Sequence, residues 1–125
     1  MKELFSFRGR INRGTFWGIS IVNAIVFGGL FVIFGGLLTV LEHVESKALS
    51  TLIIAGLLLF TLLSICVQCA TCVKRLHDTN HMGCLVLIGL IPIIGGLFLL
   101  AVCGFFPGTA GPNDYGHAPP RRNLQ

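Results

Sequence analysis

Three long stretches without a single charged residue constrain this chain more than any other feature of its sequence. They cover residues 15–41, 48–73 and 83–106. An apolar helix needs about 20 residues to cross the hydrocarbon core of a bilayer, so each stretch is long enough to do so. The first is also longer than the apolar part of a cleaved signal peptide, which has roughly 7–15 residues. The sequence predicts an all-α integral membrane protein, a small bundle of three hydrophobic segments.

The composition agrees with a single membrane domain over residues 1–125. Hydrophobic residues make up 54% of the chain and charged residues 11%, whereas a soluble domain carries about 25% charged residues. So few charges cannot cover the surface of a water-soluble globule. The connections between the hydrophobic segments are too short for another domain, which leaves a polar segment at 1–14 and a polar tail at 107–125.

Basic residues cluster just outside the hydrophobic segments. Those before the first segment and after the second are Lys2, Arg8, Arg10, Arg13, Lys74 and Arg75, whereas only Lys47 lies between these two segments. Lys and Arg collect on the cytoplasmic side of membrane proteins. We therefore expect a multi-pass protein with a cytoplasmic amino terminus. Nucleic-acid binding would need a contiguous basic face on a folded surface, so we expect these charges to meet membrane lipids and not nucleic acid.

The third hydrophobic segment contains a helix break at Pro92, Gly95 and Gly96. Proline removes a backbone donor and clashes with the preceding turn, and glycine tolerates irregular geometry. We expect a kinked helix that crosses the membrane once, because non-helical backbone is costly in lipid unless protein covers it. A re-entrant hairpin is the alternative, and it would return the basic tail to the side of the amino terminus.

The segment at 1–14 has the pattern of a cytoplasmic segment that lies in the membrane interface. It combines an apolar stripe with three arginines that would face lipid phosphates: Leu4, Phe7 and Ile11, then Arg8, Arg10 and Arg13. Phe16 and Trp17 follow, and we expect their rings at the headgroup boundary. The arginines are interpreted first as a topological anchor, and recognition of a lipid or a partner protein is the functional alternative.

The loop after the second hydrophobic segment is rich in polar residues. His77 and His81 have the spacing of two metal ligands on one helix face, but Asp78 is the only carboxylate beside them and Asn80 predicts a turn. We therefore expect neither a metal nor a cofactor. No nucleophile is marked for a catalytic His77–Asp78 pair. The favoured interpretation is structural: Asp78 pairs with Arg75 or an amino-terminal arginine and closes the ends of the helices.

Two amide side chains within the hydrophobic segments are predicted to meet. Asn23 and Gln68 lie at similar depths if the first two segments form an antiparallel hairpin. A hydrogen bond between them would satisfy two polar groups inside the membrane. Four glycines leave one face of the first segment nearly bare, which favours close approach of another helix; they are Gly28, Gly29, Gly35 and Gly36. The sequence leaves open which helix that is.

Three cysteines of the second segment have a C-x2-C-x2-C spacing, at Cys66, Cys69 and Cys72. This spacing resembles a run that ligates iron–sulfur clusters, but those ligands come from loops that wrap around the cluster. A straight helix cannot point three thiolates at one site. We interpret these cysteines as small hydrophobic packing residues.

The motifs of the chain also occur, in the same order, in a known family. They are Phe7-Arg8-Gly9-Arg10 with Arg13 and Phe16-Trp17, Arg75-Leu76-His77-Asp78-Thr79, Ile91-Pro92 with Gly95, and Gly108-Thr109, Gly111-Pro112-Asn113 and Tyr115-Gly116. Over nearly its whole length the chain resembles domain-of-unknown-function family 805 (DUF805), small bacterial inner membrane proteins of the YhaH/YhaI type. The resemblance implies a helical inner-membrane protein without an established biochemical activity. His81 and Asp114 depart from the family pattern.

Together these features predict a non-enzymatic protein of the bacterial inner membrane. We expect it to bind lipid headgroups or a membrane-protein partner through a cytoplasmic face whose residues are Arg8, Arg10, Arg13, Arg75, His77 and Asp78. Self-association of the chain is a further expectation. The alternative is a subunit of an oligomeric small transporter or channel, with the Pro92–Gly96 break on its pathway. The scarcity of ionisable residues within the hydrophobic segments speaks against that alternative.

Overall fold

Asn12 caps the first helix, α1 (Arg13–Leu41). Its side-chain Oδ1 accepts a hydrogen bond from the Thr15 amide at 2.7 Å, and its carbonyl accepts one from the Phe16 amide at 3.0 Å. Such a cap satisfies amides that have no partner in the first turn. The computed structural model describes residues 7–41 and 47–119. Residues 7–12 are not helical, so the expected apolar stripe does not lie on a helix there, and Leu4 is outside the described residues.

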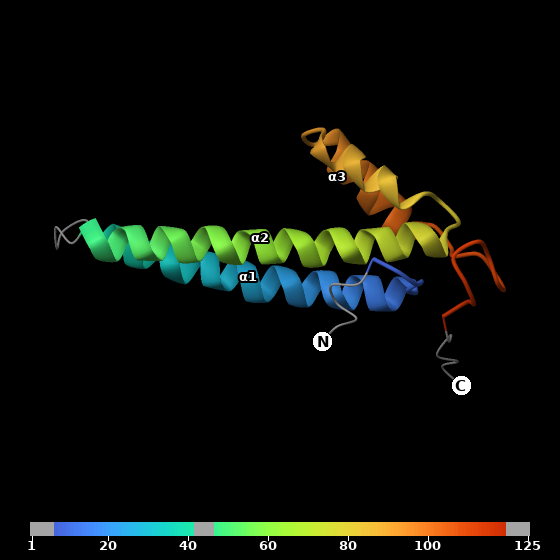
Figure 1. Ribbon diagram of the computed structural model, residues 1–125, viewed down its shortest axis with the longest axis horizontal. Coiled ribbons are helices and arrows are strands. Elements are labelled where there is room, and N and C mark those ends of the chain that lie inside the picture. Colours follow the sequence, from blue (N-terminus) through green and yellow to red (C-terminus); the bar gives the residue numbers. More distant parts are fainter. Residues whose placement is uncertain (1–6, 42–46, 120–125) are drawn as a thin grey trace.

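The second helix, α2 (Lys47–Asp78), runs back along α1, and the two form a long antiparallel hairpin (Figure 1). Both helices are long and apolar enough to cross a membrane, with a mean hydropathy of 2.5 in the most apolar window of each. Only 6% and 11% of those windows are buried inside the molecule. Most of their apolar side chains therefore face outward, which is the arrangement that a lipid environment favours.

A Schellman motif ends α2. Asn80 adopts the left-handed conformation at φ +58°. The His81 amide donates to the Leu76 carbonyl at 2.8 Å, and the Asn80 amide donates to the His77 carbonyl at 3.2 Å. Asparagine tolerates this conformation better than other residues that carry a side chain. The turn that Asn80 predicts is therefore present, and it directs the chain away from the axis of α2.

The third hydrophobic segment folds into a short hairpin, which we call the arm. It consists of a 3₁₀ helix, η2 (Gly83–Leu90), a helix α3 (Ile94–Leu100), and a π-helical turn, η3 (Ala101–Phe105). The arm leaves α2 at its carboxyl end, reverses direction, and returns to the same end (Figure 1). The expectation of a single kinked span is therefore wrong, and the hairpin alternative describes the fold.

Gly95 is the residue that lets the arm fold back. An ideal Cβ at this position would lie 1.8 Å from the carbonyl oxygen of Ile88 and 3.0 Å from the Cα of Gly89. Only glycine permits two backbones to approach so closely. By contrast, a Cβ at the neighbouring Gly96 would meet nothing within 4 Å. Of the two glycines in the predicted break, Gly95 is therefore the one that the packing of α3 on η2 requires.

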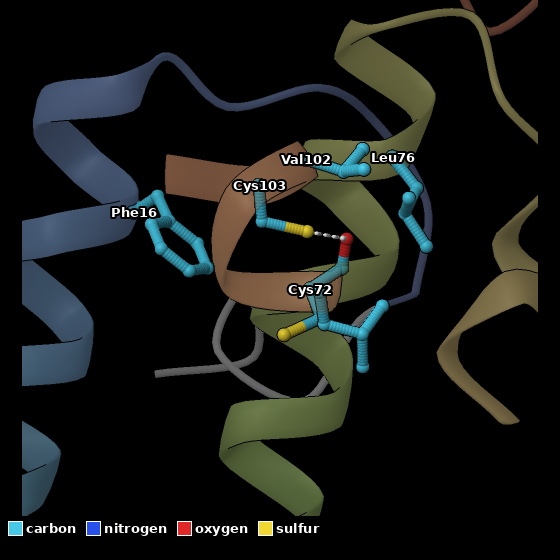
Figure 2. Close-up of a cluster of buried hydrophobic side chains, with 6 residues drawn as sticks. Phe16, Cys72, Leu76, Val102 and Cys103 are labelled. Carbon is cyan, nitrogen blue, oxygen red and sulfur yellow. Dashed lines mark hydrogen bonds between the residues drawn. The ribbon is translucent and has the colours of Figure 1, made fainter. Parts of the chain in front are cut away.

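The core lies where the arm returns to the α1–α2 hairpin, and its close-up is shown in Figure 2. Its buried residues come from α1, α2, α3 and η3, and they are Phe16, Cys72, Leu76, Leu99, Val102 and Cys103. Phe16 is only 2% exposed, so its ring lies inside the protein and not at the headgroup boundary, where the sequence placed it. The ring is buried because the returning arm covers the face of α1 that Phe16 occupies.

Candidate functional site

Segments from three parts of the chain meet at one end of the molecule, which we call the polar end. They are residues 7–12, the carboxyl end of α2, and the tail from residue 106 to residue 117 (Figure 1). Asp78 lies at their meeting point. Its Oδ1 is 3.0 Å from Nη2 of Arg10, and its Oδ2 pairs with Nη1 of Arg75. The carboxylate therefore has both of the partners between which the sequence left the choice open.

Arg10 attaches the tail to the segment before α1. Its Nε donates to Asp78 Oδ1 at 3.1 Å. Its Nη1 donates to the carbonyls of Gly111 and Gly116, at 2.8 and 3.0 Å. Its Nη2 donates to the carbonyl and the hydroxyl of Thr109, at 2.8 and 3.0 Å. All three nitrogens of the guanidinium are thus used within the chain, and the side chain is only 1% exposed.

Arg75 joins α2 to the end of the arm. Its side chain is 0% exposed. Nε donates to the carbonyl of Cys103 at 2.8 Å, and Nη2 donates to the carbonyl of Phe106. Carbonyls at the end of a helix have no partners in the following turn, and a buried guanidinium supplies donors for them. Arg75 therefore fixes the position at which the arm ends, and it fixes the carboxylate of Asp78 as well.

The tail packs closely onto the end of α2. An ideal Cβ at Gly108 would lie 1.9 Å from Asp78 Oδ2, and the Thr109 amide donates to the Asp78 carbonyl at 2.8 Å. Asn113 Nδ2 donates to the His77 carbonyl at 2.8 Å. The His77 ring stacks on Tyr115, with the ring centroids 4.0 Å apart and the planes 6° apart. Residues 108–116 thus form an ordered lid over Asp78 and His77.

The six residues expected to form a binding face divide into two groups. Asp78, Arg10 and Arg75 are buried and bonded to one another or to the backbone, and His77 is covered by Tyr115. Arg8 and Arg13 are exposed, and Nη1 of Arg13 donates to the Phe105 carbonyl at 3.4 Å. Arg10 and Arg75 therefore hold the protein together and do not offer their guanidinium groups to a lipid, which corrects the expectation that they do.

The two histidines with metal-ligand spacing have different contacts. His77 stacks on Tyr115, and Nδ1 of His81 lies 2.9 Å from the Thr79 hydroxyl. Within 7–41 and 47–119, no group of three or more His, Cys, Asp or Glu side chains is placed to hold a metal ion. The three cysteines of α2 differ in environment, since Cys66 is exposed and Cys72 is buried in the core. The site is therefore built for ionic and hydrogen-bonded contacts.

A ladder of polar side chains joins α1 to α2 away from the polar end. Asn23 Nδ2 donates to Gln68 Oε1 at 3.4 Å and to the Ser64 carbonyl at 3.3 Å. The Ser64 hydroxyl donates to Asn23 Oδ1 at 3.3 Å, and Gln68 Nε2 donates to the Ser20 hydroxyl at 3.2 Å. The amide pair predicted from the sequence is thus part of a larger ladder, in which two serines complete the hydrogen bonds.

The residues of the lid carry no sequence pattern that assigns them a role. Gly108, Thr109, Asn113 and Tyr115 are the residues that close over Asp78. The sequence does show that residues 107–116 are rich in Gly, Asn and Pro, the residue types that form turns. That density predicts a tight turn, but it does not say that the turn packs on α2.

Comparison with known proteins relates the chain to inner membrane proteins. The family described as "Protein of unknown function (DUF805)" matches residues 4–117. The inner membrane protein YhaI of Escherichia coli K12 is 32% identical over 121 residues, which cover 95% of this chain and 90% of YhaI. The inner membrane protein YhaH of the same strain is 32% identical over 122 residues, which cover 95% of this chain and 91% of YhaH. No solved structure matches the chain significantly. The chain, an all-helical integral membrane protein, therefore belongs to the DUF805 family.

Proposed function

We propose that this protein is a non-enzymatic, multi-pass protein of the bacterial inner membrane whose polar end faces the cytoplasm and binds anionic lipid headgroups through Arg8 and Arg13. The observation that carries the proposal is the division of the arginines at the polar end. The side chains of Arg10 and Arg75 are buried, whereas Arg8 and Arg13 are exposed beside them. Arg10 and Arg75 both pair with Asp78, and we call these three residues the lock. The lock holds the segment of residues 7–12, in and next to which Arg8 and Arg13 are exposed.

The surroundings of Arg13 favour a lipid as the ligand. Arg13 begins α1, and Trp17 lies one turn further along the same helix. The Trp17 indole is half-buried and donates to the Gly104 carbonyl at 3.3 Å. Tryptophan concentrates at the headgroup level of membranes, so Arg13 lies at the depth of the phosphates. A planar guanidinium binds a phosphate through two parallel hydrogen bonds, which an ammonium group cannot form.

The test replaces Arg8 and Arg13 by lysine together. The charge and the insertion topology are preserved by these changes, but bidentate binding is lost. We expect the double variant, purified from native membranes, to retain several-fold less phosphatidylglycerol in native mass spectrometry, with an unchanged unfolding temperature. The conservative change Lys47→Arg, at the opposite end of α2, is the matched control and should leave lipid retention unchanged.

Two results would overturn the proposal. Equal retention of phosphatidylglycerol by the double variant and the natural chain would mean that the arginines only orient the protein. Loss of a co-purifying protein with no change in lipid would mean that the exposed pair binds a membrane-protein partner. A drop in the unfolding temperature would instead place Arg8 or Arg13 in the lock.

One observation favours a second candidate, a subunit of an oligomeric small transporter or channel. The arm is interrupted at residues 91–93, and its two halves run side by side. Broken hydrophobic segments of this kind line pathways in several transporter folds. Within the described residues, however, the polar side chains of the α1–α2 ladder are already bonded to one another. Solute flux in proteoliposomes distinguishes the candidates, because a lipid-binding protein should give none.

A further inference from the structure

The tip of the arm, residues 89–94, is strongly exposed. Leu90 and Ile93 are each 80% exposed. Ile93 has a φ of +65°, which is strained for a β-branched residue. The arm contains no charged residue between Gly83 and Phe105. An uncharged, strained and exposed turn of this kind is stable only if its surroundings hold it in place.

The tip also carries backbone groups without partners. Pro92 has no amide hydrogen. Within the described part of the chain, neither the Leu90 carbonyl nor the Ile93 amide forms a hydrogen bond. An unpaired backbone group is costly in hydrocarbon, and non-helical backbone is found at membrane depth only where protein or water covers it. The tip therefore needs a partner that can supply hydrogen bonds as well as apolar contact.

The described residues of this chain leave the tip largely uncovered. α3 packs principally on η2 and η3, and the arm leans away from α2 toward its tip (Figure 1). The eight residues of η2 place the tip about 16 Å from the polar end, at the 2.0 Å rise of a 3₁₀ helix. The unpaired groups thus lie well inside the apolar part of the protein.

A groove between α1 and α2 offers both apolar side chains and polar residues. It has a volume of about 210 Å³. Its lining includes Phe27, Gly28, Phe31, Leu57 and Phe60, together with two residues that carry hydroxyls, Thr61 and Ser64. A Cβ at Gly28 would meet nothing within 4 Å, so another backbone can approach closely there.

The hydroxyl oxygens of Thr61 and Ser64 could accept a hydrogen bond from the backbone of the tip. The Thr61 hydroxyl donates to the Leu57 carbonyl at 2.8 Å, and the Ser64 hydroxyl donates to Asn23 Oδ1. Each hydroxyl oxygen still has lone pairs that can accept a hydrogen bond from the Ile93 amide. Ser64 lies 14 residues before Asp78, the last residue of α2, and thus about 21 Å from the polar end at 1.5 Å per residue. The tip and the groove therefore lie at similar depths.

We propose that the tip of the arm docks into the α1–α2 groove of a second copy of this chain. All copies insert into the membrane with one orientation, so the tip of one copy and the groove of its neighbour share the same depth. A two-fold axis along the membrane normal makes the exchange reciprocal, with each arm covering the other's groove. The proposal is independent of lipid binding at the polar end, because none of its residues belongs to that site.

The first experiment is intermolecular disulfide cross-linking in native membranes. Two differently tagged copies are co-expressed after replacement of the native cysteines by alanine, one with Ile93→Cys and the other with Ile65→Cys, which lies on the groove. We expect a cross-linked band that carries both tags. Leu52→Cys is the control. Leu52 is more exposed on α2 than Ile65, at 69% against 53%, but it lies 13 residues further from the polar end and should give at least five-fold less product.

A second experiment uses the chain with its native cysteines. Gly28→Leu fills the groove, and Gly36→Leu introduces the same side chain on α1 outside it. Single-molecule photobleaching in nanodiscs should show dimers for the natural chain and for Gly36→Leu, and monomers for Gly28→Leu. A monomeric natural chain, a Gly28→Leu variant that still dimerises, or equal cross-linking of Ile65→Cys and Leu52→Cys would overturn the proposal. A monomer that retains a phospholipid would identify an acyl chain as the occupant of the groove.

Discussion

Asp78 is the single carboxylate on which the polar end depends. It pairs with Arg10 and Arg75, and all three side chains are almost completely buried. Loss of one member of a buried ionic group leaves its partners charged and unsolvated, which costs about 3–5 kcal/mol. An exposed ion pair contributes about 0–1 kcal/mol. The stability of the protein should therefore respond far more to Asp78 than to charges on its surface.

We expect Asp78→Asn to lower the free energy of unfolding by about 3–5 kcal/mol, because two guanidinium groups lose their counter-charge. Asp78→Glu should be milder, since it keeps the charge. Chemical denaturation of the full chain in detergent measures both effects. Asp114→Asn removes an exposed carboxylate from the tail and should change stability by less than about 0.5 kcal/mol. Equal stabilities for Asp78→Asn and the natural chain would show that the carboxylate is solvated.

The pairing of α1 with α2 depends on polar contacts as well as packing. Asn23 bonds to Ser64 and Gln68 across the two helices, whereas the bond of the Thr39 hydroxyl among the described residues is to the Gly36 carbonyl of its own helix. We expect Asn23→Ala to destabilise the hairpin by about 0.6–2 kcal/mol, the range for hydrogen bonds between helices in membranes. Thr39→Ala should have a smaller effect in the same unfolding assay. If the two variants are indistinguishable, the ladder contributes no net stability.

Gly95 and Gly96 are neighbours in the arm but differ in the space that a side chain would have. A Cβ at Gly95 would overlap the Ile88 carbonyl, but a Cβ at Gly96 would enter open space. We expect Gly95→Ala to destabilise the protein by about 1–3 kcal/mol through overpacking. Gly96→Ala should be neutral or stabilise α3 by up to about 1 kcal/mol, since alanine is the better helix former. The unfolding temperature in detergent separates the two variants, and a similar loss in both would mean that α3 does not pack on η2.

The arrangement of the whole molecule predicts its topology. Because the arm returns to the end of α2, the amino-terminal segment, the turn at residue 80 and the tail should all lie on one side of the membrane (Figure 1). From the distribution of the basic residues, we expect that side to be the cytoplasmic one. In a variant without native cysteines, Asn80→Cys and His117→Cys should react with a membrane-impermeant maleimide only after the cells are opened, whereas Lys47→Cys should react in intact cells. Labelling of His117→Cys in intact cells would rule out this topology.

Several features were predictable from residue patterns because they depend on interactions that are local or that any membrane imposes. The lengths of the apolar stretches predict α1 and α2, since a bilayer requires about 20 apolar residues per crossing. Asn80 predicts the end of α2 through its tolerance of the left-handed conformation. Asn23 and Gln68 were predicted to meet because an antiparallel hairpin brings equal depths together, and polar groups in lipid need partners.

The remaining features depend on contacts between distant parts of the chain. Pro92 and Gly95 indicate a break in the helix. Whether the chain then continues or turns back depends on the packing of Gly95 against Ile88 and on the hydrogen bond from Arg75 to the end of the arm. The arginines look alike in sequence, yet Arg10 is buried because the lid of residues 108–116 offers it three carbonyls and a hydroxyl. Composition and periodicity describe one segment at a time, so the membrane class and the long helices follow from the sequence. The path of the arm and the separation of buried from exposed arginines follow only from packing, because burial is a property of the neighbours that folding brings together.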